Sequence, residues 1–129
     1  MRTLREYIEE AGKEGRALGH FNISNIEGFW AVVNAGKSLN LPVIIGVSEG
    51  ERDFVGINQV IALVESVRAQ GLPVFLNADH TYSIERIREV VDAGFDSVII
   101  DEADKSEEEN IRITKEAVEY AREKNPNIL

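Results

Sequence analysis

The sequence predicts an α/β fold in which one helix is followed by four strand–helix units, which is a (βα)4 half of a TIM (β/α)8 barrel. Helical and strand-like segments alternate along the chain. The strand-like runs are short and lack apolar–polar alternation, which is typical of parallel strands buried on both faces. The chain has 129 residues, whereas a closed barrel takes roughly 250.

The first segment, residues 3–14, is expected to form a helix that precedes the repeating units. Thr3 and Glu6 fit a capping box, and Gly15 can end the helix. The single domain 1–129 then continues with βα units that start near 17, 42, 73 and 96. Strands are expected at 17–23, 41–48, 72–79 and 96–101, and helices at 24–40, 57–71, 83–94 and 106–125.

Caps and repeats support this order of elements. Ser24 and Ser106, each with a glutamate three residues later, fit capping boxes, and Ser83 fits a simple N-cap. Gly94 and Pro126 end the last two helices. The tripeptide Leu-Pro-Val opens both the second and the third strand run, which indicates related units.

The two edges of such a sheet have no partner strand. The final residues, "NPNIL", have the pattern of a fifth strand that has just begun. Unpaired edges and an apolar inner face favour pairing with another chain. We therefore expect a homodimer or larger assembly that forms through the open barrel edges.

Composition excludes several classes of function. The net charge is −9, with 14 basic against 23 acidic residues and no basic stripe, so we expect no nucleic-acid partner. No apolar run reaches the roughly 20 residues of a membrane helix, and the N-terminus lacks the apolar core of a signal peptide. We expect a cytoplasmic protein with no membrane partner. The chain has no cysteine, which excludes thiolate chemistry.

Each predicted strand ends in polar residues: Asn22, Ser48, the pair Asp79-His80, and Asp101. The carboxyl ends of parallel strands carry the active sites of barrel enzymes. Turn chemistry is an alternative explanation for Asn22 and Ser48. The pair suits a metal ligand beside an acid/base, or alternatively a local turn hydrogen bond. Asp101 could support a metal or orient a ligand, or it could simply be a solvated residue of the acidic loop that follows.

Two further polar residues are expected to have lesser roles. His20 lies within the first strand run, and we interpret it as a partly buried structural histidine. Arg52, in "SEGERDF", is expected to be an exposed loop cation that could meet a phosphate.

Several linked stretches resemble the N-terminal half of the class II, metal-dependent fructose-bisphosphate aldolases, a family that includes tagatose-bisphosphate aldolases. They are "HFNISNIEGFWAVVNAGKSLNLPVIIGVSEGE", "PVFLNADHTYSIERIREVVDAGFDSVIID" and "EEENIRITKEAVEYA". The resemblance covers residues 17–121 in family order. It implies a (β/α)8 barrel enzyme of glycolysis that cleaves a sugar bisphosphate to dihydroxyacetone phosphate and an aldehyde. Zinc at the barrel mouth would polarise the substrate carbonyl.

The resemblance also implies roles for the residues at the strand ends. Asp79 matches the acid/base that handles the proton on the C4 hydroxyl, and His80 matches a zinc ligand. Asp101 matches an aspartate beside the metal, and Asn22 and Ser48 match residues that line the substrate site.

The family uses three zinc-binding histidines, two of them from the second half of the barrel. This chain has only His20, which matches no ligand, and His80. We therefore expect doubtful zinc binding and little or no aldolase activity from the chain alone. Two alternatives remain: a non-catalytic, self-associating half-barrel scaffold, and one half of a split aldolase.

Overall fold

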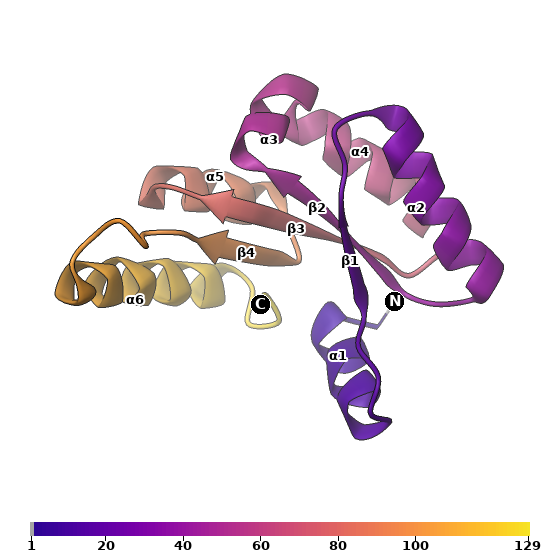
Figure 1. The fold of residues 1–129 in the computed structure, drawn as a ribbon, viewed down its shortest axis with the longest axis horizontal. Coiled ribbons are helices and arrows are strands. Elements are labelled where there is room, and N and C mark those ends of the chain that lie inside the picture. Colours follow the sequence, from indigo (N-terminus) through magenta and orange to yellow (C-terminus); the bar gives the residue numbers. More distant parts are fainter. Residues whose placement is uncertain (1) are drawn as a thin grey trace.

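The computed structural model describes residues 2–129, which form one open, four-stranded parallel sheet with most of its helices on one face (Figure 1). The strands lie in the order β1-β2-β3-β4, as a half-barrel requires. The elements are α1 (Leu4–Lys13), β1 (Gly19–Asn22), α2 (Ile26–Leu39), β2 (Val43–Ser48), α3 (Glu49–Val55), α4 (Ile57–Arg68), β3 (Val74–Thr81), α5 (Ile84–Ala93), β4 (Ser97–Ile100) and α6 (Glu107–Lys124).

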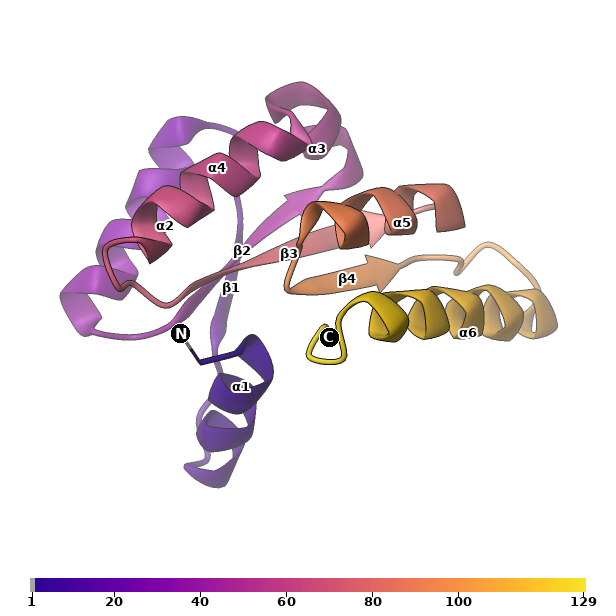
Figure 2. The same ribbon diagram turned by 180° about the vertical axis from the view of Figure 1, so that it is seen from behind.

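The main core lies between the sheet and the helices α2, α4 and α5, which cover one face of it (Figure 2). Successive strand residues point to opposite faces. Val43, Ile45 and Val47 of β2 therefore enter this core, together with alternate residues of β3. A second core joins α5 to α6 and includes Ile128. The opposite face of the sheet corresponds to the interior of a barrel, and we call it the inner face.

Helix α1 packs at the end of the inner face where the strands begin (Figure 1). The ring of Tyr7 lies 5.5 Å from the ring of Phe75, and Leu4 is 2% exposed. The expected capping box is present, because Thr3 accepts from the Glu6 amide while the Glu6 side chain accepts from the Thr3 amide. Much of the remaining inner face is open, and Ile99 on it is 40% exposed.

Two helix starts differ from expectation. Asn25, rather than Ser24, caps α2, and its Oδ1 accepts from the Gly28 amide at 2.8 Å. The third helical residue is then a glycine, so no reciprocal box can form. Residues 49–55 form the helix α3, capped by Ser48, where a loop was expected. Gly56, with φ of 94°, separates α3 from α4.

The last residue pairs with the free edge of β4. Leu129 donates its amide to Asp96 O at 3.1 Å, and its carbonyl accepts from the Val98 amide at 2.9 Å. These are the two hydrogen bonds that a parallel strand makes on either side of one residue. The final segment thus lies where a fifth strand would begin. Within residues 2–129, no helix is long and apolar enough to cross a membrane.

Candidate active site

Four of the five predicted site residues form one polar row, made of two hydrogen-bonded pairs, at the carboxyl ends of the strands. Asn22 Nδ2 donates to Asp79 Oδ2 at 2.7 Å, and His80 Nδ1 donates to Asp101 Oδ2 at 2.7 Å. The two halves of the row meet where Asp79 Oδ1 lies 3.9 Å from His80 Nε2. Three strands therefore contribute to a single polar site.

Ser48 stands beside this row rather than within it. It pairs in register with Asp79. Its hydroxyl accepts from the Glu51 amide at 3.4 Å, as the N-cap of α3. The cap explains why β2 ends in a serine. Its predicted contact with substrate stays a prediction.

A β-bulge at the end of β3 explains how Asp79 and His80 can point toward each other. Neighbouring side chains in a regular strand point to opposite faces. Here the β3–β4 register passes from Ala78↔Val98 to Thr81↔Ile100, so β3 contains one extra residue. His80 has φ of 46°, which is sterically costly for a residue with a Cβ atom. Because of the bulge, the side chains of Asp79 and His80, which are adjacent in sequence, also lie close together in the site.

The charge of His80 is coupled to two carboxylates. The hydrogen bond that His80 donates to Asp101 and then the charge of Asp79 raise the pKa of the imidazole above its ordinary 6.5. The same bond to His80, with the Ala103 amide donating to Oδ1 at 3.2 Å, lowers the pKa of Asp101. Because a carboxylate only accepts, Nδ1 carries the proton and Nε2 is the atom available for a ligand.

The described residues do not bring a full set of zinc ligands together. Catalytic zinc takes three protein ligands. Within residues 2–129, no group of three or more His, Cys, Asp or Glu side chains is placed to hold a metal ion. Both oxygens of Asp101, a predicted metal ligand, already accept hydrogen bonds, from His80 and from Ala103. Its geometry suits the carboxylate that orients a metal-binding histidine.

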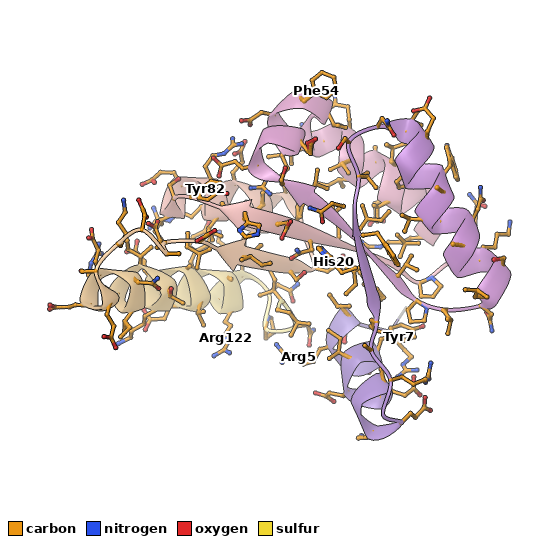
Figure 3. All side chains as sticks on the ribbon, in the orientation of Figure 1. Arg5, Tyr7, His20, Phe54, Tyr82 and Arg122 are labelled. Carbon is orange, nitrogen blue, oxygen red and sulfur yellow. The ribbon has the colours of Figure 1, made fainter. Side chains whose placement is uncertain are left out.

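His20 proves to be exposed, which corrects the expectation of a partly buried residue. It lies on β1 and faces the inner side of the sheet (Figure 3). Asn77 Nδ2 donates to His20 Nε2 at 3.1 Å, and Ser97 Oγ donates to Asn77 Oδ1 at 2.7 Å. A Cβ atom at Gly46 would lie 2.4 Å from His20 Nε2, so only glycine leaves room for this ring.

Asn77 was missed by sequence reasoning, although an amide inside the apolar run 74–78 was a signal for it. It is 4% exposed. His20, Asn77 and Ser97 thus form a second polar row on the inner face. This row borders an open cavity of about 350 Å³, which Leu4 and Ile8 of α1 also line.

Arg52 is buried, which corrects the expectation of an exposed loop cation. It is 1% exposed, and burial lowers the pKa of its guanidinium. Nη1 donates to Val47 O at 2.6 Å and to Asp79 O at 3.3 Å, and Nη2 donates to Thr81 Oγ1 at 2.9 Å. The expectation failed because helix α3, which was not predicted, turns this side chain inward against the strand ends.

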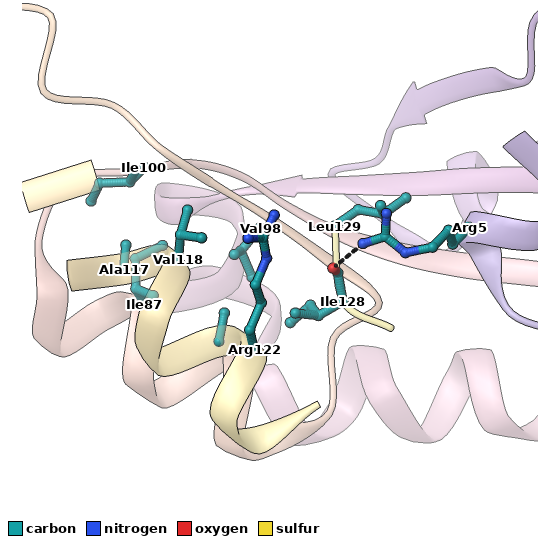
Figure 4. Close-up of a pocket in the computed structure, with 10 residues that line it drawn as sticks. Arg5, Ile87, Val98, Ile100, Ala117, Val118, Arg122, Ile128 and Leu129 are labelled. Atoms are coloured by element: carbon teal, nitrogen blue, oxygen red, sulfur yellow. Dashed lines mark hydrogen bonds between the residues drawn. The ribbon is translucent and has the colours of Figure 1, made fainter. Parts of the chain in front are cut away.

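A separate apolar hollow of about 250 Å³ lies along β4 and α6 (Figure 4). Val98, Val118 and Ile128 line it, and Arg5 closes one end by donating to Ile128 O at 3.0 Å. The hollow adjoins the free edge of β4, where a further βα unit of a barrel would pack.

A parallel sheet in the order β1-β2-β3-β4, with polar side chains at the carboxyl ends of its strands, has the architecture of one half of a (β/α)8 barrel. The chain belongs to the class II fructose-bisphosphate aldolase family, because the model of that family, described as "Fructose-bisphosphate aldolase class-II", matches residues 2–128.

Relatives and solved structures agree with this assignment. Fructose-bisphosphate aldolase of Staphylococcus aureus is 38% identical over 130 residues, covering 98% of this chain and 46% of the relative. That of Geobacillus stearothermophilus is 40% identical over 124 residues, covering 92% and 43%. The YdjI aldolase of Escherichia coli K12 superposes with a TM-score of 0.81 at 30% identity, covering 92% and 47%. A putative fructose-1,6-bisphosphate aldolase of Coccidioides immitis gives 0.85 at 27%, also covering 92% and 47%. The chain thus spans about half the length of the relatives it matches.

Proposed function

We propose that this chain supplies the first half of a class II aldolase site that acts on a sugar bisphosphate once a second half-barrel completes it. The polar row Asn22–Asp79–His80–Asp101, made of two hydrogen-bonded pairs that meet at 3.9 Å, carries the proposal. It presents one carboxylate and one outward imidazole nitrogen side by side at the edge where barrel enzymes bind substrate.

In this proposal, Asp79 is the acid/base for the substrate hydroxyl. Asn22 holds one of its oxygens, and this contact orients the carboxylate and leaves Oδ1 on the side of His80. Oδ1 takes the proton of the C4 hydroxyl as the carbon–carbon bond breaks and returns it in the condensation direction. His80 Nε2 offers one zinc ligand, and Asp101 fixes its ring. A bound zinc ion would supply Lewis-acid polarisation of the substrate carbonyl.

In this proposal, the second half-barrel attaches at the two free edges of the sheet. Leu129 already bonds to the free edge of β4, and the apolar hollow beside it is open (Figure 4). The edge of β1 is the other free edge of the sheet. We propose that four further βα units, in continuation of this chain or as a separate chain, cover both edges and bring the missing zinc ligands.

The test compares the 129-residue chain alone with the same chain mixed with the C-terminal half of the Staphylococcus aureus relative. Cleavage of fructose 1,6-bisphosphate is measured with zinc present. We expect no activity from the chain alone and activity on mixing, reduced by about 10² to 10⁴-fold in Asp79→Asn. Asp104→Asn, an exposed neighbour in the acidic loop, serves as the matched control and should retain activity. Robust zinc-dependent cleavage by the chain alone contradicts the proposal.

A second candidate function is a scaffold formed by two copies of this chain. The open inner face favours it, because Ile8 and Ile99 remain 41% and 40% exposed there. Native mass spectrometry with and without zinc distinguishes the candidates. A dimer that binds no zinc supports the scaffold. A monomer that binds zinc only when mixed with the second half supports the split site.

A further inference from the structure

The end of β3 is held by a buried arginine from α3. Arg52 donates to Val47 O at 2.6 Å and to Asp79 O at 3.3 Å through Nη1, and to Thr81 Oγ1 at 2.9 Å through Nη2. Arg52 is 1% exposed and Thr81 is fully buried. One guanidinium therefore ties the end of β2 to two positions of β3.

These contacts bracket His80. Asp79 precedes it and Thr81 follows it, and Arg52 bonds to both. One residue further on, the amide of Tyr82 donates to Glu49 Oε2 at 3.1 Å, and this carboxylate lies 3.8 Å from Arg52 Nη2. The bracketed residue is the one with φ of 46°. A residue with a Cβ atom keeps that backbone conformation only where its surroundings hold it.

Packing alone does not explain a charged residue in this place. Burying a guanidinium costs free energy, and an apolar side chain of similar volume fills such a space at lower cost. Within the described residues, Arg52 Nε is buried with no hydrogen-bond partner, which adds to the cost. The guanidinium offers what an apolar side chain lacks, because its fork of donors can bind several fixed acceptors at once.

We infer that Arg52 is a positioning residue, whose buried guanidinium fixes the bulge that brings Asp79 and His80 to the same side of the sheet. The inference deepens the proposed function and rests on it for its catalytic meaning. Arg52 itself lies under the strand ends and touches the backbone of Asp79 rather than the reacting groups.

The experiment is solution NMR of Arg52→Met, with the backbone and side-chain shifts of His80 as the readout. Wild type is expected to show the Cα and Cβ shifts of a left-handed residue at 80 and cross-peaks between the Asp79 and His80 side chains. Arg52→Met is expected to lose both while its remaining spectrum stays dispersed. Arg52→Lys, which can still donate to the two carbonyls, is expected to retain them.

Arg68→Met is the matched control. Arg68 donates to Val74 O at 2.8 Å and pairs with Asp96, so it also binds a strand carbonyl, but at the opposite end of the sheet. This variant should be destabilised without any change in the His80 signature. If any arginine that binds a strand carbonyl had the same structural effect, both variants would give the same outcome.

An unchanged His80 signature in folded Arg52→Met overturns the inference. Where Arg52→Met does not fold, Thr81→Val decides, because it removes a single acceptor from a buried position. A shifted His80 signature in Thr81→Val then supports the inference, and an unshifted one overturns it. Neither measurement needs zinc, substrate or a second half-barrel. The activity test can therefore fail while Arg52 is still shown to fix the bulge, and the NMR test can fail while the activity test succeeds.

Discussion

His80 shows how far a site can depend on the backbone of one residue. Its positive φ lets two sequence neighbours face each other, with Asp79 Oδ1 3.9 Å from Nε2. A residue free to relax would turn the imidazole away from the carboxylate. Such backbone conformations gather at functional sites, where the surrounding contacts maintain them. At His80, Arg52 holds the neighbouring backbone through the carbonyl of Asp79, and Asp101 holds the imidazole ring.

The ion pair predicts a pH dependence that can be measured residue by residue. In an NMR titration, we expect the pKa of His80 to lie above 6.5, and Asp101→Asn to lower it, because the hydrogen bond that His80 donates to Asp101 is the largest cause of the shift. Because the pKa of His80 is raised and that of Asp101 is lowered, the pair stabilises the folded chain fully between their ordinary pKa values of 3.8 and 6.5. That stabilisation fades as the pH rises through the raised value.

Asp104→Asn tests whether removing any one negative charge from the acidic loop lowers the pKa of His80 in the same way. Asp104 lies in the same acidic loop and pairs with Lys105 rather than with His80. It should leave the His80 titration unchanged. Equal titrations of His80 in wild type and Asp101→Asn contradict the assigned hydrogen bond.

At the scale of elements, caps and one short helix decide the local geometry. α3 occupies the turn after β2, and it carries both Glu49 and Arg52 to the bulge. Its sequence, with Gly50 inside and Gly56 after it, has little apolar periodicity and is typical of a loop. Contacts with the strand ends, rather than its own propensity, stabilise a helix this short.

The start of α2 gives a direct test of cap assignment. We expect Asn25→Ala to lower the free energy of unfolding by about 1 kcal/mol, since its side chain satisfies the Gly28 amide. Ser24→Ala, the neighbouring residue, should change it by less than about 0.5 kcal/mol. Urea denaturation of both variants measures the difference. Equal losses would show that the two residues share the cap.

At the scale of the whole molecule, the chain is one layered half of a barrel whose inner face is open. α1 covers this face only where the strands begin, so Leu4 and Phe75 are buried while Ile99 is 40% exposed. Cores of barrels are closed by side chains from all strands. The exposed part of the inner face is therefore the surface that a second half is expected to cover.

Ile99→Asn separates the stability of the chain from its association. We expect the free energy of unfolding of the isolated chain to change by no more than about 1 kcal/mol, because the side chain is already part exposed. Binding of the complementary half-barrel should weaken at least about tenfold, since an amide would then lie in a closed apolar core. Calorimetric titration measures the affinity. Leu39→Asn, at the end of α2 and 67% exposed, should bind as wild type. Equal binding of both variants contradicts closure over the inner face.

The sequence by itself determined the order of the helices and strands apart from α3, the parallel half-barrel, the family, and the set of polar residues at the strand ends. These follow from local signals, because hydrophobic period, caps and stop residues act within one element. The row Asn22–Asp79–His80–Asp101 was foreseeable as a set because parallel strands bring their carboxyl ends to one edge.

Only the tertiary structure decided how these residues meet. The bulge at His80, the inward turn of Arg52 and the exposure of His20 depend on residues that are distant in sequence, such as Arg52 and Thr81 or His20 and Asn77. A local sequence pattern cannot predict such contacts. Each of them forms only when the strands pair in register and the side chains pack against one another. The chain therefore specifies its elements locally and the geometry of its site through packing between them.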